Sequence, residues 1–228
     1  MGSLAPDTTR HSRLVKSWWR LVRFGFRLLY NEMAFTYDAV SWIVSLGQWR
    51  NWQRAALDHL NTPPGARILE LAHGTGNFEL DLLAAGYRPV ALDLSRAMGR
   101  IARRKLREHG YLPLLVRGQA QALPFPDASF PAVVSTFPTE FIVDPATLGE
   151  IVRVLQPGGR LVVVFNGVLT RGSLARDALE FAYRATGQRG PWPVDVEGRM
   201  RAAGLEPSIV TATLPRSQVL LFLGEKTP

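Results

Sequence analysis

Glu70-Leu-Ala-His-Gly-Thr-Gly76 is the segment that most narrows the range of folds open to this chain. It follows a short apolar run, Arg67 to Leu71, that predicts a β-strand, and it precedes a helical pattern that reaches about Ala85. Small residues in a strand-to-helix turn let backbone N–H groups approach a ligand closely, and the helix N-terminus favours negative charge. A dinucleotide fingerprint would need a third glycine three residues after Gly76, where Glu79 stands, which argues against a nicotinamide cofactor.

Three further elements follow at the ends of other predicted strands. Asp93 ends the second strand, 89–92, where a carboxylate beside the first turn can accept both hydrogen bonds of a ribose diol. Arg117-Gly-Gln-Ala-Gln-Ala-Leu-Pro-Phe-Pro-Asp-Ala-Ser-Phe130 follows the third strand. Leu155-Gln-Pro-Gly-Gly-Arg-Leu161 leads into the fifth strand. Together with the glycine turn, these elements place polar and small residues where a cofactor could bind.

Alternating strands and helices predict a doubly wound α/β fold with a seven-stranded, mostly parallel sheet. The last two strands are expected to form an antiparallel hairpin around Pro215-Arg216. The expected strands are 67–71, 89–92, 112–116, 132–136, 160–165, 208–214 and 218–223. The expected helices are 12–31, 35–46, 49–60, the segment after Gly76, 95–108 with Ser95 as its cap, 145–155, 173–186 and a short helix ending near 203. We therefore expect an N-terminal helical extension at 1–62 and a core domain at 63–228.

The four elements, in this order and spacing, resemble the class I S-adenosylmethionine-dependent methyltransferases, in detail over about residues 63–165. Phe35-Thr-Tyr-Asp38, ahead of the core, resembles the Tyr-Asp segment of the ubiquinone/menaquinone biosynthesis C-methyltransferase branch. The resemblance implies a Rossmann-like fold and S-adenosyl-L-methionine as cofactor. It also implies a small, lipophilic acceptor such as a quinone precursor.

The resemblance implies roles for individual residues around the cofactor. Asp93 would bind the ribose hydroxyls, with Leu94 against the adenine. Gln119 and Ala120 would face the adenine edge, and Thr136 would border the cofactor at the end of the fourth strand. The methionine part would be held by Glu70 and the turn residues Ala72, His73, Gly74 and Gly76.

Three positions depart from the family pattern. Ala72 stands where Gly is common, Gln119 stands where Asp is usual, and Pro131 replaces the Asp that usually follows Ser-Phe. The amide oxygen of Gln119 can still accept from the adenine amine, although the charge is absent. Pro131 makes the start of the fourth strand uncertain.

The segment Ser135-Thr-Phe-Pro-Thr-Glu-Phe141 should border the reacting methyl group. Glu140 is the candidate base or acceptor-orienting residue, and the alternative is an ordinary acid at a helix start. Tyr37 is expected to cap the cofactor or line the acceptor pocket, and the alternative is a packing tyrosine. We interpret His73 as a polar filler of the turn rather than a base. The chain contains no Cys, which excludes a disulfide, a Cys-ligated metal and a Cys nucleophile, and we predict no metal site.

The net charge of +8 is concentrated near the N-terminus, where six bases and no acid lie between Arg10 and Arg27. On the predicted helix 12–31, Lys16, Arg20, Arg23 and Arg27 form a stripe beside an apolar face that contains Trp18. This helix is expected either to lie on an anionic membrane surface or to pack as a lid. The recurring bases exclude a membrane span or secretory signal there, so we expect a cytoplasmic protein, peripheral to a membrane under the first alternative.

Other functions fit the same features. A phospholipid headgroup N-methyltransferase would share them. An RNA-binding methyltransferase or a non-catalytic RNA binder would use the basic N-terminal helix. The aromatic residues of that helix lie on or near its apolar face and do not form a stacking platform, so a nucleic-acid partner is disfavoured. The acceptor, the methylated atom and the oligomeric state are not determined by the sequence.

Overall fold

The computed structural model describes residues 37–170 and 195–227. The predicted helices 12–31 and 173–186 lie outside the described residues. Of the predicted N-terminal extension, only the part from residue 37 is therefore described.

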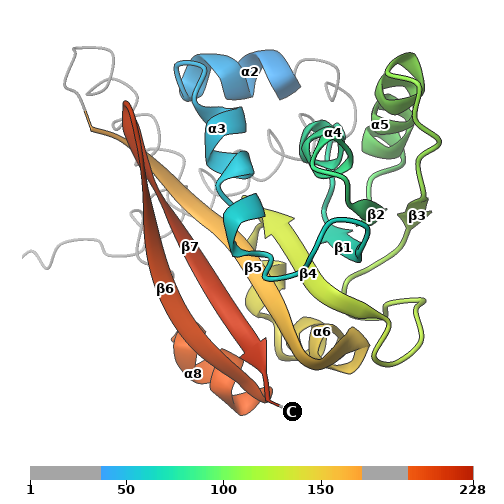
Figure 1. Ribbon diagram of the computed structural model, residues 1–228, viewed down its shortest axis with the longest axis vertical. Coiled ribbons are helices and arrows are strands. Elements are labelled where there is room, and N and C mark those ends of the chain that lie inside the picture. The colour runs from blue at the N-terminus through green and yellow to red at the C-terminus, as the bar shows by residue number, and fades with distance from the viewer. Residues whose placement is uncertain (1–36, 171–194, 228) are drawn as a thin grey trace, which may run out of the picture.

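A seven-stranded sheet forms the centre of the fold, in the order β3-β2-β1-β4-β5-β7-β6 (Figure 1). Strands β1 to β5 run parallel to one another, and β7 is antiparallel to both β5 and β6. The chain moves outward from β1 to β3 and then returns to place β4 on the other side of β1. This reversal between β1 and β4 is the position where doubly wound sheets bind ligands. The strands are β1 (Arg67–Leu71), β2 (Arg88–Asp93), β3 (Leu115–Arg117), β4 (Phe130–Thr136), β5 (Leu155–Leu169), β6 (Leu205–Leu214) and β7 (Ser217–Lys226).

Helices cover both faces of the sheet, with α3 and α4 on one face and α6 and α8 on the other (Figure 1). Along β1, Ile68 packs with Trp52 of α3 and Phe78 of α4. The next residue, Leu69, packs into the opposite cluster, which contains Ile151 of α6. The helices are α2 (Tyr37–Val44), α3 (Trp49–Arg54), α4 (Asn77–Ala84), α5 (Arg96–Glu108), α6 (Pro145–Val154) and α8 (Val196–Ala202), with 3-10 turns η2 (Leu57–His59) and η3 (Glu140–Val143). A parallel sheet buried on both faces explains the continuous apolar runs of its strands.

The helix α3 is anchored across the sheet by Trp52, which is fully buried. Its indole Nε1 donates to Ser217 Oγ at 2.9 Å, although the two residues are far apart in the sequence. Gly167 of β5 lies directly against the ring, because a Cβ there would approach Trp52 Cδ2 to 2.2 Å. The helix that precedes the predicted core is therefore part of the sheet's own hydrophobic packing.

The strands β6 and β7 extend up to three residues beyond their predicted bounds, and four other elements had boundaries that were wrong for identifiable reasons. The predicted helix 49–60 ends at Arg54, because the chain tightens into the 3-10 turn η2, which leaves Leu60 fully buried. The strand β3 begins at Leu115 rather than 112, after Pro113, which has no N–H donor. The strand β5 extends to Leu169 because it pairs with β7 along that length. The strand β4 begins at Phe130, and its register with β5 shifts across Pro131.

The closing hairpin around Pro215-Arg216 and the cap of α5 are confirmed. Residues Leu214 and Ser217 pair across the turn of β6 and β7. The side chain of Ser95 accepts from Met98 N at 3.2 Å, as expected of an N-cap serine. In 37–170 and 195–227, no helix has the length and apolar character needed to cross a bilayer.

Candidate functional site

The glycine turn adopts a left-handed backbone at three positions, with φ of +57° at Ala72, +55° at Gly74 and +79° at Gly76. A Cβ at Gly76 would lie 3.0 Å from Ala102 Cβ, so this glycine is required for close packing against α5. A Cβ at Gly74 would meet nothing within 4 Å, which leaves open space beside its backbone. The turn thus combines a packing glycine with a glycine whose backbone a ligand can approach.

Asp93 at the end of β2 holds this turn in place. Its Oδ2 accepts from Gly74 N at 2.9 Å, and its Oδ1 accepts from Ser95 N at 2.7 Å. A carboxylate oxygen can accept two hydrogen bonds, so each oxygen keeps one acceptor position. Asp93 can therefore fix the turn and still accept from two further donors.

Two buried acids lie behind the turn without hydrogen-bond partners. Glu70 Oε2 and both carboxylate oxygens of Glu79 are unpaired. Burial, reinforced by the nearby Glu79, Asp93 and Asp81, holds the pKa of Glu70 well above its ordinary value. Burial raises the pKa of Glu79 to about 8. The raised pKa favours the protonated form of each acid, and a bound cation would favour their ionised forms.

His73 is buried in the same turn, with Nδ1 at 2.9 Å from the carbonyl oxygen of Gly74. A carbonyl can only accept, so Nδ1 carries the hydrogen of this bond. Burial lowers the pKa of His73, which favours the neutral imidazole. These contacts fit the interpretation of His73 as a polar filler.

Asp38 of α2 also binds the turn, through residues other than those that Asp93 contacts. Its Oδ1 accepts from Thr75 Oγ1 at 2.6 Å and from Asn77 Nδ2 at 2.9 Å. Its Oδ2 pairs with Lys105 Nζ of α5 at 2.6 Å, and Lys105 also donates to Asn77 Oδ1 at 2.7 Å. We call these four side chains the Asp38 clasp. It joins α2, the turn and α5.

The carboxyl end of β4 faces α3. Gln53 Nε2 donates to Thr136 Oγ1 at 2.9 Å. The next residue, Phe137, has a left-handed backbone with φ of +51°, and its ring stacks on Trp49 with centroids 4.1 Å apart. A non-glycine residue in this conformation is often found at a functional site. The pair Trp49 and Phe137 places flat apolar surface beside the end of β4.

The predicted adenine contacts lie near the ends of β2 and β3. Leu94 has 58% of its surface exposed, directly after Asp93. Gly118 N donates to Asp93 O at 3.2 Å, which brings the segment after β3 beside the end of β2. In that segment, Gln119 is exposed and Ala120 is buried. The structure therefore places Leu94, Gln119 and Asp93 at one edge of the sheet.

The two candidate catalytic residues are not brought into this arrangement by any described contact. Glu140 begins η3 with an exposed side chain, and it makes no hydrogen bond or ion pair within 37–170 and 195–227. Tyr37 begins α2, but its side chain lies outside the described part of the chain. The described residues also contain no group of three or more His, Asp or Glu that could hold a metal ion.

Three features of the site were missed by sequence reasoning. The role of Asp38 was signalled only by its place in the Phe35-Thr-Tyr-Asp38 segment. Gln53 carried no signal, because its partner Thr136 is remote in sequence. Glu79 was noted only as the residue that breaks the dinucleotide pattern. Its burial arises because α4 is enclosed by neighbours from residue 78 to residue 82.

Comparison with known proteins identifies relatives of similar sequence. A demethylmenaquinone methyltransferase of Renibacterium salmoninarum is 35% identical over 69% of this chain and 65% of its own length. One of Beutenbergia cavernae is 41% identical over 59% of this chain and 55% of its own length. The chain thus spans less than two thirds of these two relatives. The ubiquinone/menaquinone biosynthesis C-methyltransferase UbiE of Hahella chejuensis is 31% identical over 78% of this chain and 82% of its own length.

Solved structures share the fold at low sequence identity. The YcgJ protein of Bacillus subtilis has a TM-score of 0.60 at 15% identity, over 78% of this chain and 99% of its own. The geranyl diphosphate C-methyltransferase of Streptomyces coelicolor has a TM-score of 0.59 at 16% identity, over 77% of this chain and 78% of its own. The sequence model of the ubiE/COQ5 methyltransferase family matches residues 25–185. The chain belongs to the ubiE/COQ5 methyltransferase family, which confirms the class I S-adenosylmethionine-dependent methyltransferase predicted from the sequence.

Proposed function

We propose that this chain transfers a methyl group from S-adenosylmethionine to a small, lipophilic quinone precursor. The observation that carries the proposal is the bond from Gly74 N to Asp93 Oδ2, at 2.9 Å, beside the open space at Gly74. This bond holds together a turn that a ligand can approach and a carboxylate that can accept further hydrogen bonds. Both lie where the strand order reverses between β1 and β4. Family membership gives the class of reaction, and the relatives named for menaquinone or ubiquinone synthesis suggest the class of acceptor.

The residues around the turn fit the cofactor. When bound, S-adenosylmethionine supplies an electrophilic methyl group on a positively charged sulfur. The remaining acceptor positions of Asp93 suit the two ribose hydroxyls, and Leu94 offers apolar surface to the adenine. The unpaired oxygens of the buried Glu70 and Glu79 suit a cationic ligand, because releasing their protons would give compensating negative charge.

The end of β4 suits an aromatic, apolar acceptor. Trp49 and Phe137 provide stacked rings beside Thr136, and flat rings pack favourably on such surfaces. We propose that the acceptor ring lies here. A base near a ring hydroxyl would take its proton and leave a more nucleophilic ring, and Glu140 and Tyr37 remain our candidates for that role or for orienting the acceptor.

Radiolabelled methyl transfer tests the choice of acceptor. The full chain is incubated with methyl-labelled S-adenosylmethionine and a cell extract, and the products are separated into quinone, phospholipid and RNA fractions. We expect label in the quinone fraction. Label in phospholipid headgroups would favour the headgroup N-methyltransferase, label in RNA would favour the RNA enzyme, and label in none would refute the activity.

We also propose that residues 1–62 form an N-terminal helical section ahead of the core at 63–228, and that helix 12–31 of this section lies on an anionic membrane surface. The charge stripe and apolar face of that predicted helix support this proposal. Co-sedimentation with anionic vesicles compares the chain with and without residues 1–31. Reduced binding of the shorter chain is expected, and equal binding would favour the lid alternative.

A further inference from the structure

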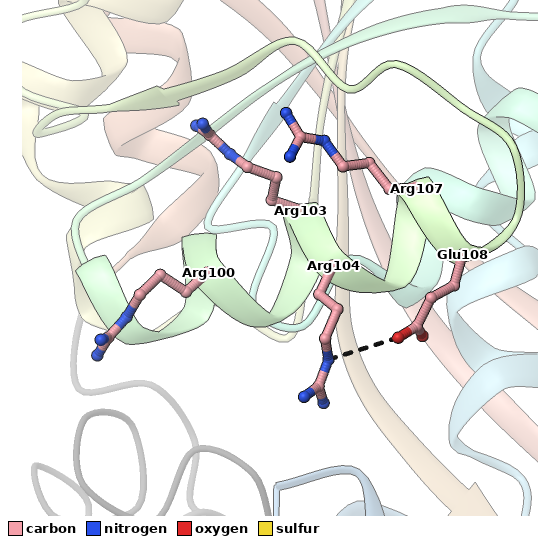
Figure 2. A pocket seen from close by; sticks show the side chains of 5 residues that line it. All are labelled: Arg100, Arg103, Arg104, Arg107 and Glu108. Carbon is pink, nitrogen blue, oxygen red and sulfur yellow. Dashed lines mark ion pairs between the residues drawn. The ribbon is translucent and has the colours of Figure 1, made fainter.

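The outer face of α5 carries five exposed arginines that the cofactor site does not use: Arg96, Arg100, Arg103, Arg104 and Arg107. Four of them line a shallow hollow together with Glu108 (Figure 2). Arg104 pairs with Glu108 at 3.7 Å, and among the described residues no ion pair joins the other four to an acid. We call this set the α5 arginine face. It concentrates positive charge that has little compensation from acids in the described part of the chain.

The opposite side of α5 provides the packing that holds the helix in place. Met98, Ala102 and Leu106 are buried at i, i+4 and i+8, and Gly76 of the cofactor turn packs against Ala102. Lys105 lies between the two sides and is occupied in the Asp38 clasp. The exposed arginines are therefore not required to fix the helix on the sheet, and apart from Arg104 none forms an ion pair with an acid in 37–170 or 195–227.

Exposed aliphatic side chains flank the α5 arginine face. Leu112 has 89% and Leu114 has 60% of its surface exposed, in the segment that joins α5 to β3. In Figure 2, that segment runs along the side of α5 toward which Arg103 and Arg107 point. Tyr111, the aromatic residue of this segment, packs against the buried cluster of Leu80, Ala102 and Leu106 instead of forming an exposed stacking surface.

We propose that the α5 arginine face, with Leu112 and Leu114, docks on an anionic phospholipid bilayer. Arginines beside exposed aliphatic side chains match a surface of negative headgroups above an apolar layer. A nucleic acid would match the charge but would gain nothing from the two leucines and would find no exposed ring to stack on. The proposal deepens the proposed function, on which it rests, because a lipophilic quinone precursor resides in a bilayer.

Vesicle binding by the full chain, without cofactor or acceptor, tests this surface. The triple variant R100Q/R103Q/R107Q is compared with R88Q/R201Q/R216Q, which removes the same charge from exposed sites on β2, α8 and the β6–β7 turn. On vesicles of phosphatidylcholine and phosphatidylglycerol in equal amounts, R100Q/R103Q/R107Q should bind about 100-fold more weakly than the control variant, or about five-fold per arginine. Equal binding by the two variants would overturn the proposal.

A site-specific probe reports where the membrane touches the chain. Because the sequence contains no Cys, L112C gives a single labelling site for an environment-sensitive fluorophore, with I209C on the exposed face of β6 as control. Anionic vesicles should shift the emission of the Leu112→Cys probe to the blue and leave the control unchanged. An unshifted Leu112→Cys probe would overturn the proposal. The proposal would also be overturned if R100Q/R103Q/R107Q lost binding to duplex RNA but still bound vesicles.

The two proposals fail in different ways. A water-soluble, short-chain quinone acceptor should be methylated equally by the wild type and by R100Q/R103Q/R107Q, because these arginines lie outside the cofactor site. Activity without α5-dependent vesicle binding would overturn only the docking surface. Vesicle binding without methylation of any quinone acceptor would overturn only the proposed function.

Discussion

Replacing Glu79 with Gln should change how the stability of the fold depends on pH. Glu79 is fully buried in α4, and neither carboxylate oxygen has a hydrogen-bond partner. Burial raises the pKa of its carboxyl to about 8, from an ordinary value of 4.5. The folded chain therefore holds a proton on Glu79 in a pH range where the unfolded chain has released it.

The sign and size of the effect follow from this difference. Between pH 4.5 and 8 the folded state binds more protons at Glu79, so the free energy of unfolding falls as the pH rises through this window. Well inside this window, the free energy of unfolding falls by about 1.4 kcal/mol for each unit by which the pH rises. From pH 5 to pH 8 the wild type should lose about 3–4 kcal/mol at this site, whereas Gln does not titrate.

Urea unfolding, followed by tryptophan fluorescence at several pH values between 5 and 8, measures this loss. The free energy of unfolding of E79Q minus that of the wild type should rise by about 3–4 kcal/mol across the series. The constant cost of burying an amide does not affect that slope. E206Q removes a carboxylate from exposed β6 and serves as the matched control. A difference that stays constant with pH would refute the assignment of Glu79 as a buried, protonated acid.

Three further substitutions test other parts of the site. D38N removes the negative charge of the Asp38 clasp and should lower the free energy of unfolding, measured in urea, by about 1–2 kcal/mol. D58N, at an exposed position, is the control, and an equal, small loss in both variants would contradict a stabilising role of the clasp. A72G relieves a left-handed backbone at φ +57° and should raise the free energy of unfolding by about 0.5–1 kcal/mol, whereas A84G, at an exposed position of α4, should lower it. A loss of stability in A72G would refute the strain. E140Q should lower the turnover number about 100-fold with unchanged cofactor affinity by titration calorimetry, and unchanged turnover would remove Glu140 from the mechanism.

Elements with strong local signals were predictable from the sequence. The strand β1 has the predicted bounds, Arg67–Leu71, because an uninterrupted apolar run meets a glycine turn. The start of α5 was found because Ser95 is a local cap. The position of Asp93 beside the glycine turn was implied by the meeting of two parallel strand ends, which is a property of the fold class, whereas its bond to Gly74 was not predicted.

Features that depend on tertiary contacts were not predictable in the same way. The bond from Trp52 to Ser217 joins α3 to the last strand, and nothing local to either residue indicates the other. The burial of Glu79 depends on the elements that enclose α4, and an isolated helix pattern would place a glutamate at the surface. The arginines of α5 lie close together in the sequence, but only the structure separates their exposed side chains from the clasp residue Lys105.

Calorimetric titration of S-adenosylmethionine into the full chain and into D93N tests the central claim most directly. Asn keeps one acceptor oxygen but loses the charge and the second acceptor that we assign to the ribose hydroxyls. We predict saturable binding of one cofactor per chain and about 10- to 100-fold weaker binding by D93N, with matching circular dichroism spectra. Absence of saturable binding by the wild type, or equal affinity of the two proteins, would contradict the cofactor site at the Gly74 turn.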